Sequence, residues 1–239
     1  MMAVLLAGGK GTRLKPFTVT IPKPLLPLDD VPILEIVIRQ LAAAGFDRIV
    51  LSLGHMHHLF AAIFGDGRRL GVKIEFSIED EPLGTAGPLK LITDCEDDFL
   101  VMNGDILTTL DYRRLFEFHR SENAWATLAV HARDVQIDYG VVEVAPNGVL
   151  YKYIEKPRLS YSVSMGINIL SRPALDFIPP GRKFDIPDLM LALKDAGKTV
   201  FCYETTCYWQ DIGRFDDFQK ANDDFVTDRA KFLPEPRHS

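Results

Sequence analysis

A glycine-rich segment with two cations lies near the beginning of the chain. Gly8, Gly9 and Gly11 follow an apolar run, and Arg13 and Lys23 come shortly after them. Glycine lets backbone N–H groups approach a ligand closely, and a loop of such groups can hold phosphate oxygens. The arginine and the lysine would neutralise the negative charge of those oxygens. The segment therefore indicates a site for a polyphosphate.

Two familiar glycine-loop patterns do not describe this segment. The dinucleotide-binding fingerprint requires glycine at its sixth position, where this chain has Leu14. The P-loop requires serine or threonine directly after its lysine, but Lys10 is followed by Gly11. A merely flexible turn would not require two cations at set places. We therefore favour a phosphate site of another type.

An aspartate stands where a metal ion could meet the phosphates. Asp105 comes at the end of an apolar run that begins at Phe99. Ligands of open α/β sheets bind beyond the carboxyl ends of the strands, and the first glycine loop is expected at the same edge. The alternative is that Asp105 caps a helix predicted over residues 112–121. Beside a phosphate loop, the favoured role of Asp105 is that of a magnesium ligand.

A second glycine loop follows three adjacent acidic residues. Glu79, Asp80 and Glu81 precede Gly84 and Thr85, in a segment that ends at residue 88. Three neighbouring carboxylates would repel one another if they were only structural. We therefore expect at least one of them to face a hydrogen-bond donor.

Apolar periodicity predicts the elements that position these loops. Residues 3–7 form an apolar run typical of a strand that is buried on both faces. A helix over residues 32–44, ended by Gly45, and a strand over 47–54 complete a right-handed parallel crossover. The remaining predicted elements are strands at 73–78, 99–105 and 127–131, helices at 59–64, 112–121 and 215–225, and a hairpin of 139–144 with 149–154 around an Asn-Gly turn.

The composition bounds the class of protein. The chain has 239 residues and a formal net charge of -6, which argues against binding to nucleic acid or to an anionic membrane. It shows neither a leader pattern nor an apolar run long enough to span a bilayer. Its three cysteines are odd in number, have no metal-like spacing, and are expected to be reduced and mostly buried. A cytoplasmic location is expected.

Three histidines allow a further, disfavoured interpretation. His55, His57 and His58 follow the second predicted strand, but no carboxylate or cysteine stands near them in a ligand-like spacing. We expect them to form the polar opening turn of the next helix.

The first loop also carries a recognisable motif. Gly-Gly-x-Gly-Thr-Arg-Leu-x-Pro-x-Thr at residues 8–18, followed by Pro-Lys-Pro at 22–24, resembles the sugar-phosphate nucleotidylyltransferases, also called nucleotide-sugar pyrophosphorylases. Later segments resemble the same family in the same order. They are Tyr-Gly-Val-Val at 139–142, Glu-Lys-Pro at 155–157, Met-Gly-Ile-Asn at 165–168 and Tyr-Trp-Gln-Asp-Ile-Gly at 208–213.

The resemblance assigns roles to individual residues. It implies that Asp211 is the second magnesium ligand beside Asp105, and that Arg13 and Lys23 complete the catalytic set. The implied sugar-phosphate residues are Gly140, Glu155, Lys156 and Asn168, the last replacing the usual aromatic residue. The implied nucleotide-binding residues are Leu6, Ala7, Gly8, Gly9, Gly11, Thr12, Arg13, Lys23, Glu79, Gly84, Thr85, Asn103 and Gly104.

The expected fold is a single α/β domain. Residues 1–225 should form a Rossmann-like, mixed but mostly parallel central sheet flanked by helices, with a small β-rich sugar-binding lobe. Residues 226–239 are expected to be a C-terminal tail. The sequence is compatible with a homo-oligomer.

The implied reaction joins a nucleoside triphosphate to a sugar 1-phosphate and releases pyrophosphate. A sugar-phosphate oxygen attacks the α-phosphorus in line, so the protein mainly positions and neutralises two anions. The attacking phosphate is already ionised at neutral pH, and no general base is assigned. The competing classes are an NAD-type oxidoreductase and a non-catalytic sugar-nucleotide-binding subunit. Two metal carboxylates together with Lys156 favour the enzyme over the binding subunit.

The second loop points to the base. Its segment, from Glu79 to Leu89, resembles that of mannose-1-phosphate and heptose-phosphate guanylyltransferases. Guanine presents two adjacent donors, which a carboxylate can accept together. GTP with a mannose- or heptose-type sugar is therefore favoured. A uridylyl- or cytidylyltransferase is the alternative, because a glutamate could also accept the uracil N3–H or the cytosine amino group.

Overall fold

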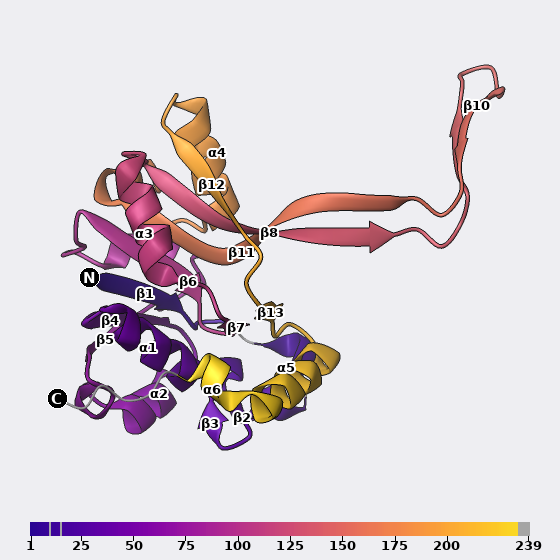
Figure 1. The fold of residues 1–239 in the computed structure, drawn as a ribbon. Helices are drawn as coiled ribbons and strands as arrows, with labels where there is room; N and C mark the ends of the chain where they lie inside the picture. The colour runs from indigo at the N-terminus through magenta and orange to yellow at the C-terminus, as the bar shows by residue number, and fades with distance from the viewer. Residues whose placement is uncertain (10, 15, 234–239) are drawn as a thin grey trace.

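A mixed β-sheet organises the chain (Figure 1). The computed structural model describes residues 1–9, 11–14 and 16–233, and in these residues the main sheet has seven strands. From edge to edge they are β12 (Val200–Thr205), β8 (Ala126–Gln136), β11 (Arg158–Ser171), β6 (Asp98–Asn103), β1 (Met2–Leu6), β4 (Arg48–Leu53) and β5 (Lys73–Ile78). Every neighbouring pair is parallel except the two that involve β11. The predicted α/β class with a mostly parallel sheet is confirmed.

The central strand β1 is buried on both faces, as its unbroken apolar run predicted. Ala3 and Leu5 point into one hydrophobic cluster, whereas Met2 and Val4 point into another. Successive side chains of a strand face opposite sides of the sheet, so a strand covered on both sides needs apolar residues at every position. The strand therefore delivers its carboxyl end, with the glycine loop, to a fixed point of the sheet edge.

Helices cover both faces of the sheet. Residues of α1 (Ile33–Ala44), α2 (His57–Phe64) and α3 (Tyr112–Ser121) join the cluster on one face. The other face is covered by α4 (Ile186–Asp195) and by the short helices η5 (Gly87–Leu91) and η6 (Arg172–Phe177). Helix α1 ends at Gly45, whose φ of 94° is left-handed, and α2 begins two residues earlier than predicted.

Helix α3 has its own cap. The Asp111 carboxylate accepts hydrogen bonds from the backbone N–H groups of Arg113 and Arg114, each at 3.1 Å. The alternative role of Asp105 as the cap of this helix therefore falls away, because that position is already filled.

A third apolar cluster closes the carboxyl-end side of the domain. It includes residues of α5 (Phe215–Thr227), α6 (Arg229–Phe232), β2 (Pro27–Leu28) and β3 (Val31–Pro32). Phe232 is 1% exposed, and its ring centroid lies 5.0 Å from that of Tyr208. The prediction of a tail from residue 226 is thus wrong for 226–233, because Phe232 completes the core; residues 234–239 lie outside the described residues.

Strands β8 and β11 continue beyond the sheet as an arm. The pairing of β12 with β8 ends at His131, whereas β8 and β11 pair on to Gln136 and Arg158. The hairpin of β9 (Val141–Val144) and β10 (Leu150–Ile154) lies at the far end of this ribbon (Figure 1). We call residues 132–164 the arm. The predicted hairpin is present, with Gly148 left-handed in its turn, but it projects away from the body instead of forming a lobe on the body.

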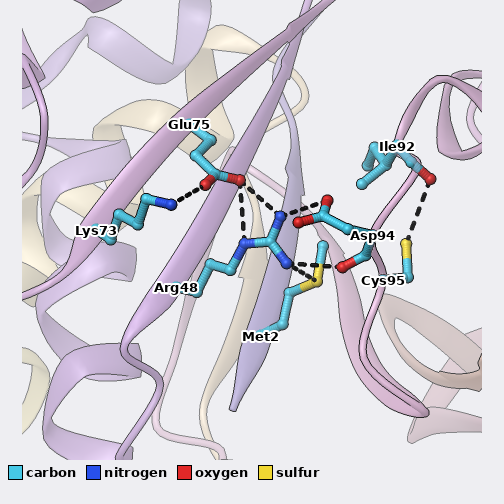
Figure 2. A network of polar contacts seen from close by, with 7 residues as sticks. All are labelled: Met2, Arg48, Lys73, Glu75, Ile92, Asp94 and Cys95. Atoms are coloured by element: carbon cyan, nitrogen blue, oxygen red, sulfur yellow. Dashed lines mark hydrogen bonds and ion pairs between the residues drawn. The ribbon is translucent and has the colours of Figure 1, made fainter.

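A network of ion pairs lies at the amino ends of the strands, opposite the ends that carry the glycine loop (Figure 2). Arg48 at the start of β4 lies between Glu75 and Asp94, with N···O distances of 2.7 and 2.6 Å. Lys73 pairs with the other oxygen of Glu75 at 2.5 Å. The Arg48 guanidinium holds the pKa of both Glu75 and Asp94 below their ordinary values. The charges at this edge are mutually compensated.

The cysteines are free, as expected, but only one is buried. Cys95 is buried, and burial raises the pKa of its thiol to about 11. Cys202 is exposed and Cys207 is half-buried, so the expectation of mostly buried cysteines is wrong. Cys202 lies on β12, an edge strand of the sheet, where alternate side chains face solvent. Among the described residues, no helix is both long enough and apolar enough to cross a membrane.

Candidate functional site

A large cavity lies at the carboxyl ends of β1, β4, β5 and β6. Its volume is about 1030 Å³, and every residue predicted to bind the nucleotide lines it except Gly104. The Gly104 N–H instead donates to the Leu6 carbonyl at 2.9 Å, which ties the end of β6 to the end of β1. The structure thus brings two glycine loops, distant in sequence, to one concave site.

The first loop needs glycine at two positions for different reasons. A Cβ atom at residue 8 would lie 2.6 Å from Oε1 of Glu79, so only glycine leaves room for that carboxylate. Gly11 has a φ of +58°, and its carbonyl accepts a hydrogen bond from the Thr18 hydroxyl at 2.8 Å. The loop is therefore shaped by its neighbours and is not a merely flexible turn.

Glu79 is held at the floor of this cavity. Its backbone N–H donates to the Leu53 carbonyl, and its Oε2 accepts from the Leu83 N–H, both at 2.9 Å. Its Oε1 lies over Gly8 and Gly54. The expectation that one of the three adjacent acidic groups faces a donor is confirmed for Glu79. A carboxylate oxygen has two lone pairs, so acceptor capacity remains toward the cavity.

The second glycine loop is attached to the start of helix α4. Oδ1 of Asp185 accepts from the backbone N–H of Thr85 at 2.9 Å and from its hydroxyl at 3.2 Å. The Thr85 hydroxyl oxygen in turn accepts from the Ile186 N–H at 2.8 Å. A Cβ at residue 84 would lie 2.6 Å from the same Asp185 oxygen. Gly84 therefore permits the contact that fixes this wall of the cavity.

A short antiparallel pair brings the two predicted metal ligands together. Asp105 directly precedes β7 (Ile106–Thr108), and Asp211 ends β13 (Trp209–Asp211). In the pairing of these strands Asp211 lies opposite Ile106, and the Ile212 N–H donates to the Asp105 carbonyl at 3.2 Å. Two carboxylates that are far apart in sequence are therefore neighbours, with Asp105 in the lining of this cavity and Asp211 close to Asp105.

The electrostatics of this pair suit a divalent cation. Burial and then the charge of Asp105 raise the pKa of Asp211, while Lys23 and Arg13 act in the opposite direction. Lys23 is only 7% exposed and forms an ion pair with Asp105. Two neighbouring carboxylates beside an open cavity form an oxygen donor set of the kind that Mg²⁺ accepts. The residues fit the expected magnesium ion.

A second cavity, of about 580 Å³, is lined by Asp211. Arg13 lines both cavities, so it stands between them. The described lining of the second cavity also includes Arg133 from β8 and Arg214, which directly follows the Asp-Ile-Gly segment. This arrangement offers three guanidinium groups to a second anion.

Sequence reasoning missed several residues that line the cavities. Arg214 could have been found from its place next to the Trp-Gln-Asp-Ile-Gly segment, whereas Arg133 and Lys183 carry no local signal. His55 and His57 line the first cavity, although we expected them only in the opening turn of a helix. The two histidines come directly after the carboxyl end of β4, which is one of the strand ends that converge at this cavity.

The predicted sugar-phosphate residues are not brought to the cleft. Gly140, Glu155 and Lys156 lie in the arm, and in the described part of the chain none of them lines either cavity. Tyr153 packs over Gly140, where a Cβ would lie 2.1 Å from the phenol oxygen, and its hydroxyl donates to Oε2 of Glu155 at 3.2 Å. Lys156 has a φ of +45°, a conformation that is rare for a residue with a side chain.

Asn168 is separate from all of these. It lies on β11 opposite Val101 and is 3% exposed, and its amide donates to the Val101 carbonyl at 3.5 Å. Its side-chain oxygen is buried and has no hydrogen-bond partner among the described residues. The structure places this residue inside the sheet and not beside the cleft.

Fold and cleft together define a Rossmann-like α/β protein with glycine loops, cations and two carboxylates at one end of its sheet. Residues 2–228 match the Nucleotidyl transferase family, and the chain belongs to that family. It is 35% identical over 92% of its length to a UTP–glucose-1-phosphate uridylyltransferase of Synechocystis, of which it covers 62%. It is 34% identical over 94% of its length to a mannose-1-phosphate guanylyltransferase of Mycobacterium tuberculosis, of which it covers 64%. The chain thus spans less than two thirds of these relatives.

Solved structures of similar length show the same fold. The crystal structure of HddC from Yersinia pseudotuberculosis superposes with a TM-score of 0.72 at 28% identity, covering 94% of this chain and 99% of that one. A crystal structure of HddC complexed with GMP-PN gives a TM-score of 0.68 at the same identity and coverage.

Proposed function

We propose that the protein is a sugar-1-phosphate nucleotidylyltransferase, which forms an NDP-sugar and pyrophosphate from a nucleoside triphosphate and a sugar 1-phosphate. The observation that carries the proposal is the meeting of Asp105 and Asp211 beside the glycine loop, between two cavities. A protein that only bound a sugar nucleotide would not need to hold two carboxylates together against their repulsion. The names of the relatives support the same reaction class.

The residues divide the work between the two anions. The backbone of the first loop binds the triphosphate, and Arg13 and Lys23 neutralise the charge that develops on the departing pyrophosphate. A phosphate oxygen of the sugar substrate attacks the α-phosphorus in line, the bond to the β-phosphate oxygen breaks, and pyrophosphate leaves. Mg²⁺, held by Asp105 and Asp211, would supply charge neutralisation for both phosphates. Lys156 is assigned to the incoming sugar phosphate by its Glu-Lys-Pro segment, although it lies in the arm and lines neither cavity of its own chain.

The second cavity suits the sugar 1-phosphate. Arg13, Arg133 and Arg214 line it together with three aspartates, and an arginine fork can match phosphate oxygens. Asp211 lines this cavity, whereas its neighbour Asp105 lines the nucleotide cavity. With the triphosphate in the first cavity, the two reacting groups would meet at Asp211. Binding alone then supplies much of the rate enhancement, because both reactants are held in one orientation.

The favoured nucleotide is GTP, and Glu79 is the reason. Its carboxylate lies at the cavity floor and keeps acceptor capacity after the hydrogen bond from Leu83. Guanine offers two adjacent donors to such a group, whereas adenine offers none at N1. The structurally similar HddC has been crystallised with GMP-PN, which supports a guanine nucleotide here as well. A mannose- or heptose-type sugar is the favoured partner substrate.

The test is a matrix of substrates with pyrophosphate release as the readout. Five nucleoside triphosphates (GTP, UTP, CTP, ATP and dTTP) are each combined with mannose, heptose and glucose 1-phosphates in the presence of Mg²⁺. We expect turnover with GTP and a mannose- or heptose-type phosphate. If no pair of substrates releases pyrophosphate, the proposed enzymatic activity is contradicted. Turnover only with UTP or CTP would contradict the assignment of guanine as the base.

A further inference from the structure

The arm extends away from the cleft of its own chain and contains part of the expected sugar-phosphate site. Of the described residues of β8, Asp134 is the outermost that lines the second cavity, and Pro157 is hydrogen-bonded to Ile137, three residues farther out. At a rise of about 3.3 Å per residue, that distance along the strand is roughly 10 Å, longer than a lysine side chain can bridge, and Lys156 lies one residue beyond Pro157. The residue that the proposed function assigns to the sugar phosphate therefore does not reach the cavity of its own chain.

The arm is a fixed extension of the sheet. From Arg158 to Ser164, β11 pairs residue by residue with β8 up to Gln136, and the irregularity in the pairing lies at the foot of the arm, between Ser164 and Asn168. Bending the arm back over its own cleft would require the pairing at its foot to change, where β8 is held between β11 and β12.

One face of the hairpin at the tip is apolar and uncovered. Val142 and Val144 of β9 lie opposite Tyr153 and Leu150 of β10, so these four side chains share a face. All four are about half exposed or more, from 49% to 60%. An isolated two-stranded hairpin is marginal in water, and it becomes stable when an apolar face is covered.

A second exposed face runs along the ribbon of β8 and β11, outward from the second cavity. His131 and Arg133 line that cavity, and Val135 follows them on the same side of β8. Leu159 and Tyr161 lie opposite Val135 and Arg133 in the pairing, so they extend the same face. An apolar strip thus runs from the cleft outward along the arm.

The exposed aromatic area of the arm is large. Four tyrosines of the arm, Tyr139, Tyr151, Tyr153 and Tyr161, are 53–79% exposed. At their usual size they expose on the order of 500 Å² together. The exposed valines and leucines add to this, and the total approaches the ~800 Å² per partner of a stable interface.

We infer that two copies of this chain exchange arms, so that the arm of one copy covers the cleft of the other and places its Lys156 at that copy's second cavity. A two-fold axis makes the exchange reciprocal, and each apolar strip is covered by the partner. The stacked rings of Phe17 and Phe215, 5.8 Å apart and about half exposed on the body, offer an apolar rim to the incoming arm. Each site is then built from two chains: the nucleotide and metal residues of one copy and the sugar-phosphate residues of the other. This inference rests on the proposed function for the role of Lys156, but not for the interface.

The interface is tested without any substrate. We expect the full chain to be a dimer by light scattering, and Val142→Asp with Val144→Asp to convert it to a folded monomer, because both valines are exposed in the single chain. The matched control is Glu143→Ala with Lys152→Ala, which removes an exposed ion pair from the other face and should leave the dimer intact. A wild-type monomer at tens of micromolar, or a double-Asp variant that stays dimeric, overturns the exchange.

The exchange of function is tested with hybrid dimers that carry a different affinity tag on each chain. Lys156→Ala and Asp211→Asn are each expected to be nearly inactive as homodimers. Their hybrid should recover about half of the wild-type activity, because one cleft then combines an intact Asp211 with the partner's intact Lys156. The control hybrid, Asp105→Asn with Asp211→Asn, should stay inactive, since both residues belong to the body.

The reciprocal hybrid gives the opposite outcome if the arm acts on its own cleft. A wild-type chain paired with a chain that carries both Lys156→Ala and Asp211→Asn should be nearly inactive when arms are exchanged. Half of the wild-type activity in this hybrid, with none in the first, overturns the inference. A wild-type dimer that turns over no substrate pair contradicts the proposed function alone, because the interface is measured separately.

Discussion

Charged residues are arranged differently at the amino ends and at the carboxyl ends of the strands in the central sheet. At the amino ends of the strands, Arg48 is paired with Glu75 and Asp94, and the pKa of both carboxyl groups is lowered. At the carboxyl ends, Asp211 stands near Asp105, and burial together with this like charge raises its pKa. The domain therefore has a compensated network at the amino ends of β4 and β5 and two like-charged carboxylates near the carboxyl end of β6. The ion pairs at the amino ends stabilise the fold, whereas the carboxylates at the carboxyl ends can bind a cation and, through it, phosphates.

The largest effect is expected from removing the repulsive pair. Asp105→Asn or Asp211→Asn should lower kcat by about a thousandfold or more, because charge neutralisation by the metal is lost at both phosphates. Steady-state kinetics at saturating Mg²⁺ measures this, and circular dichroism checks the fold. Near wild-type turnover in both variants would show that the carboxyl edge is not the reaction centre.

A stability effect without a kinetic effect is expected at the amino edge. Arg48→Met removes hydrogen bonds to the partly buried Glu75 carboxylate and the exposed Asp94 carboxylate and should cost about 2 kcal/mol, or roughly 4–8 °C in Tm, with kcat unchanged. Arg172→Met is the matched control, because its pair with Asp97 is exposed at both ends and should contribute little. A fall in kcat without a fall in Tm would break the proposed division between the edges.

The same deficit should depend on pH. Because the folded-state pKa of Glu75 is lowered, the stability that it contributes is present above its ordinary value of 4.5 and is lost as the pH falls through the folded value. The difference in Tm between wild type and Arg48→Met should therefore be full at pH 7 and shrink below pH 4. A difference that stays constant down to pH 3 would show that packing of the Arg48 stem, and not charge, carries the effect.

Two glutamates at opposite ends of β5 extend the comparison between the amino and carboxyl ends of the strands. Glu75 lies within β5 near the amino edge, whereas Glu79 directly follows the strand at the carboxyl edge. We expect Glu79→Gln to erode the preference for GTP over pyrimidine nucleotides about tenfold, because an amide presents only one acceptor atom to the two guanine donors. Glu75→Gln should lower Tm and leave kcat/KM ratios unchanged. A pyrimidine nucleotide that beats GTP tenfold in the wild type contradicts the role of Glu79.

The smallest effect is expected on the stability of the ligand-free protein. A raised pKa means that ionised Asp211 destabilises the fold at neutral pH, so Asp211→Asn should raise Tm by about 1–3 °C while it abolishes activity. Differential scanning calorimetry without Mg²⁺ measures this shift. A clear decrease in Tm would mean that the carboxylate makes a stabilising contact and that the repulsion does not dominate.

Local patterns were enough for most elements and for one half of the site. The apolar run of β1, the left-handed glycine at the end of α1 and the two glycine loops are set by residues close in sequence, and the parallel crossover brings successive strand ends to one edge. For this reason Gly8, Lys23, Glu79 and their neighbours could be assigned to the cleft from the sequence.

The tertiary structure decided what depends on distant pairings. The approach of Asp211 to Asp105 follows from the register of β13 on β7, and the lining position of Arg133 from its place on β8 next to that pair. The burial of Asn168 follows from the position of β11 between β8 and β6. A motif fixes the chemistry that a segment can perform, but the arm shows that it does not fix where the segment lies. That position is set by continuous strand pairing, a long-range interaction that no short window of sequence contains.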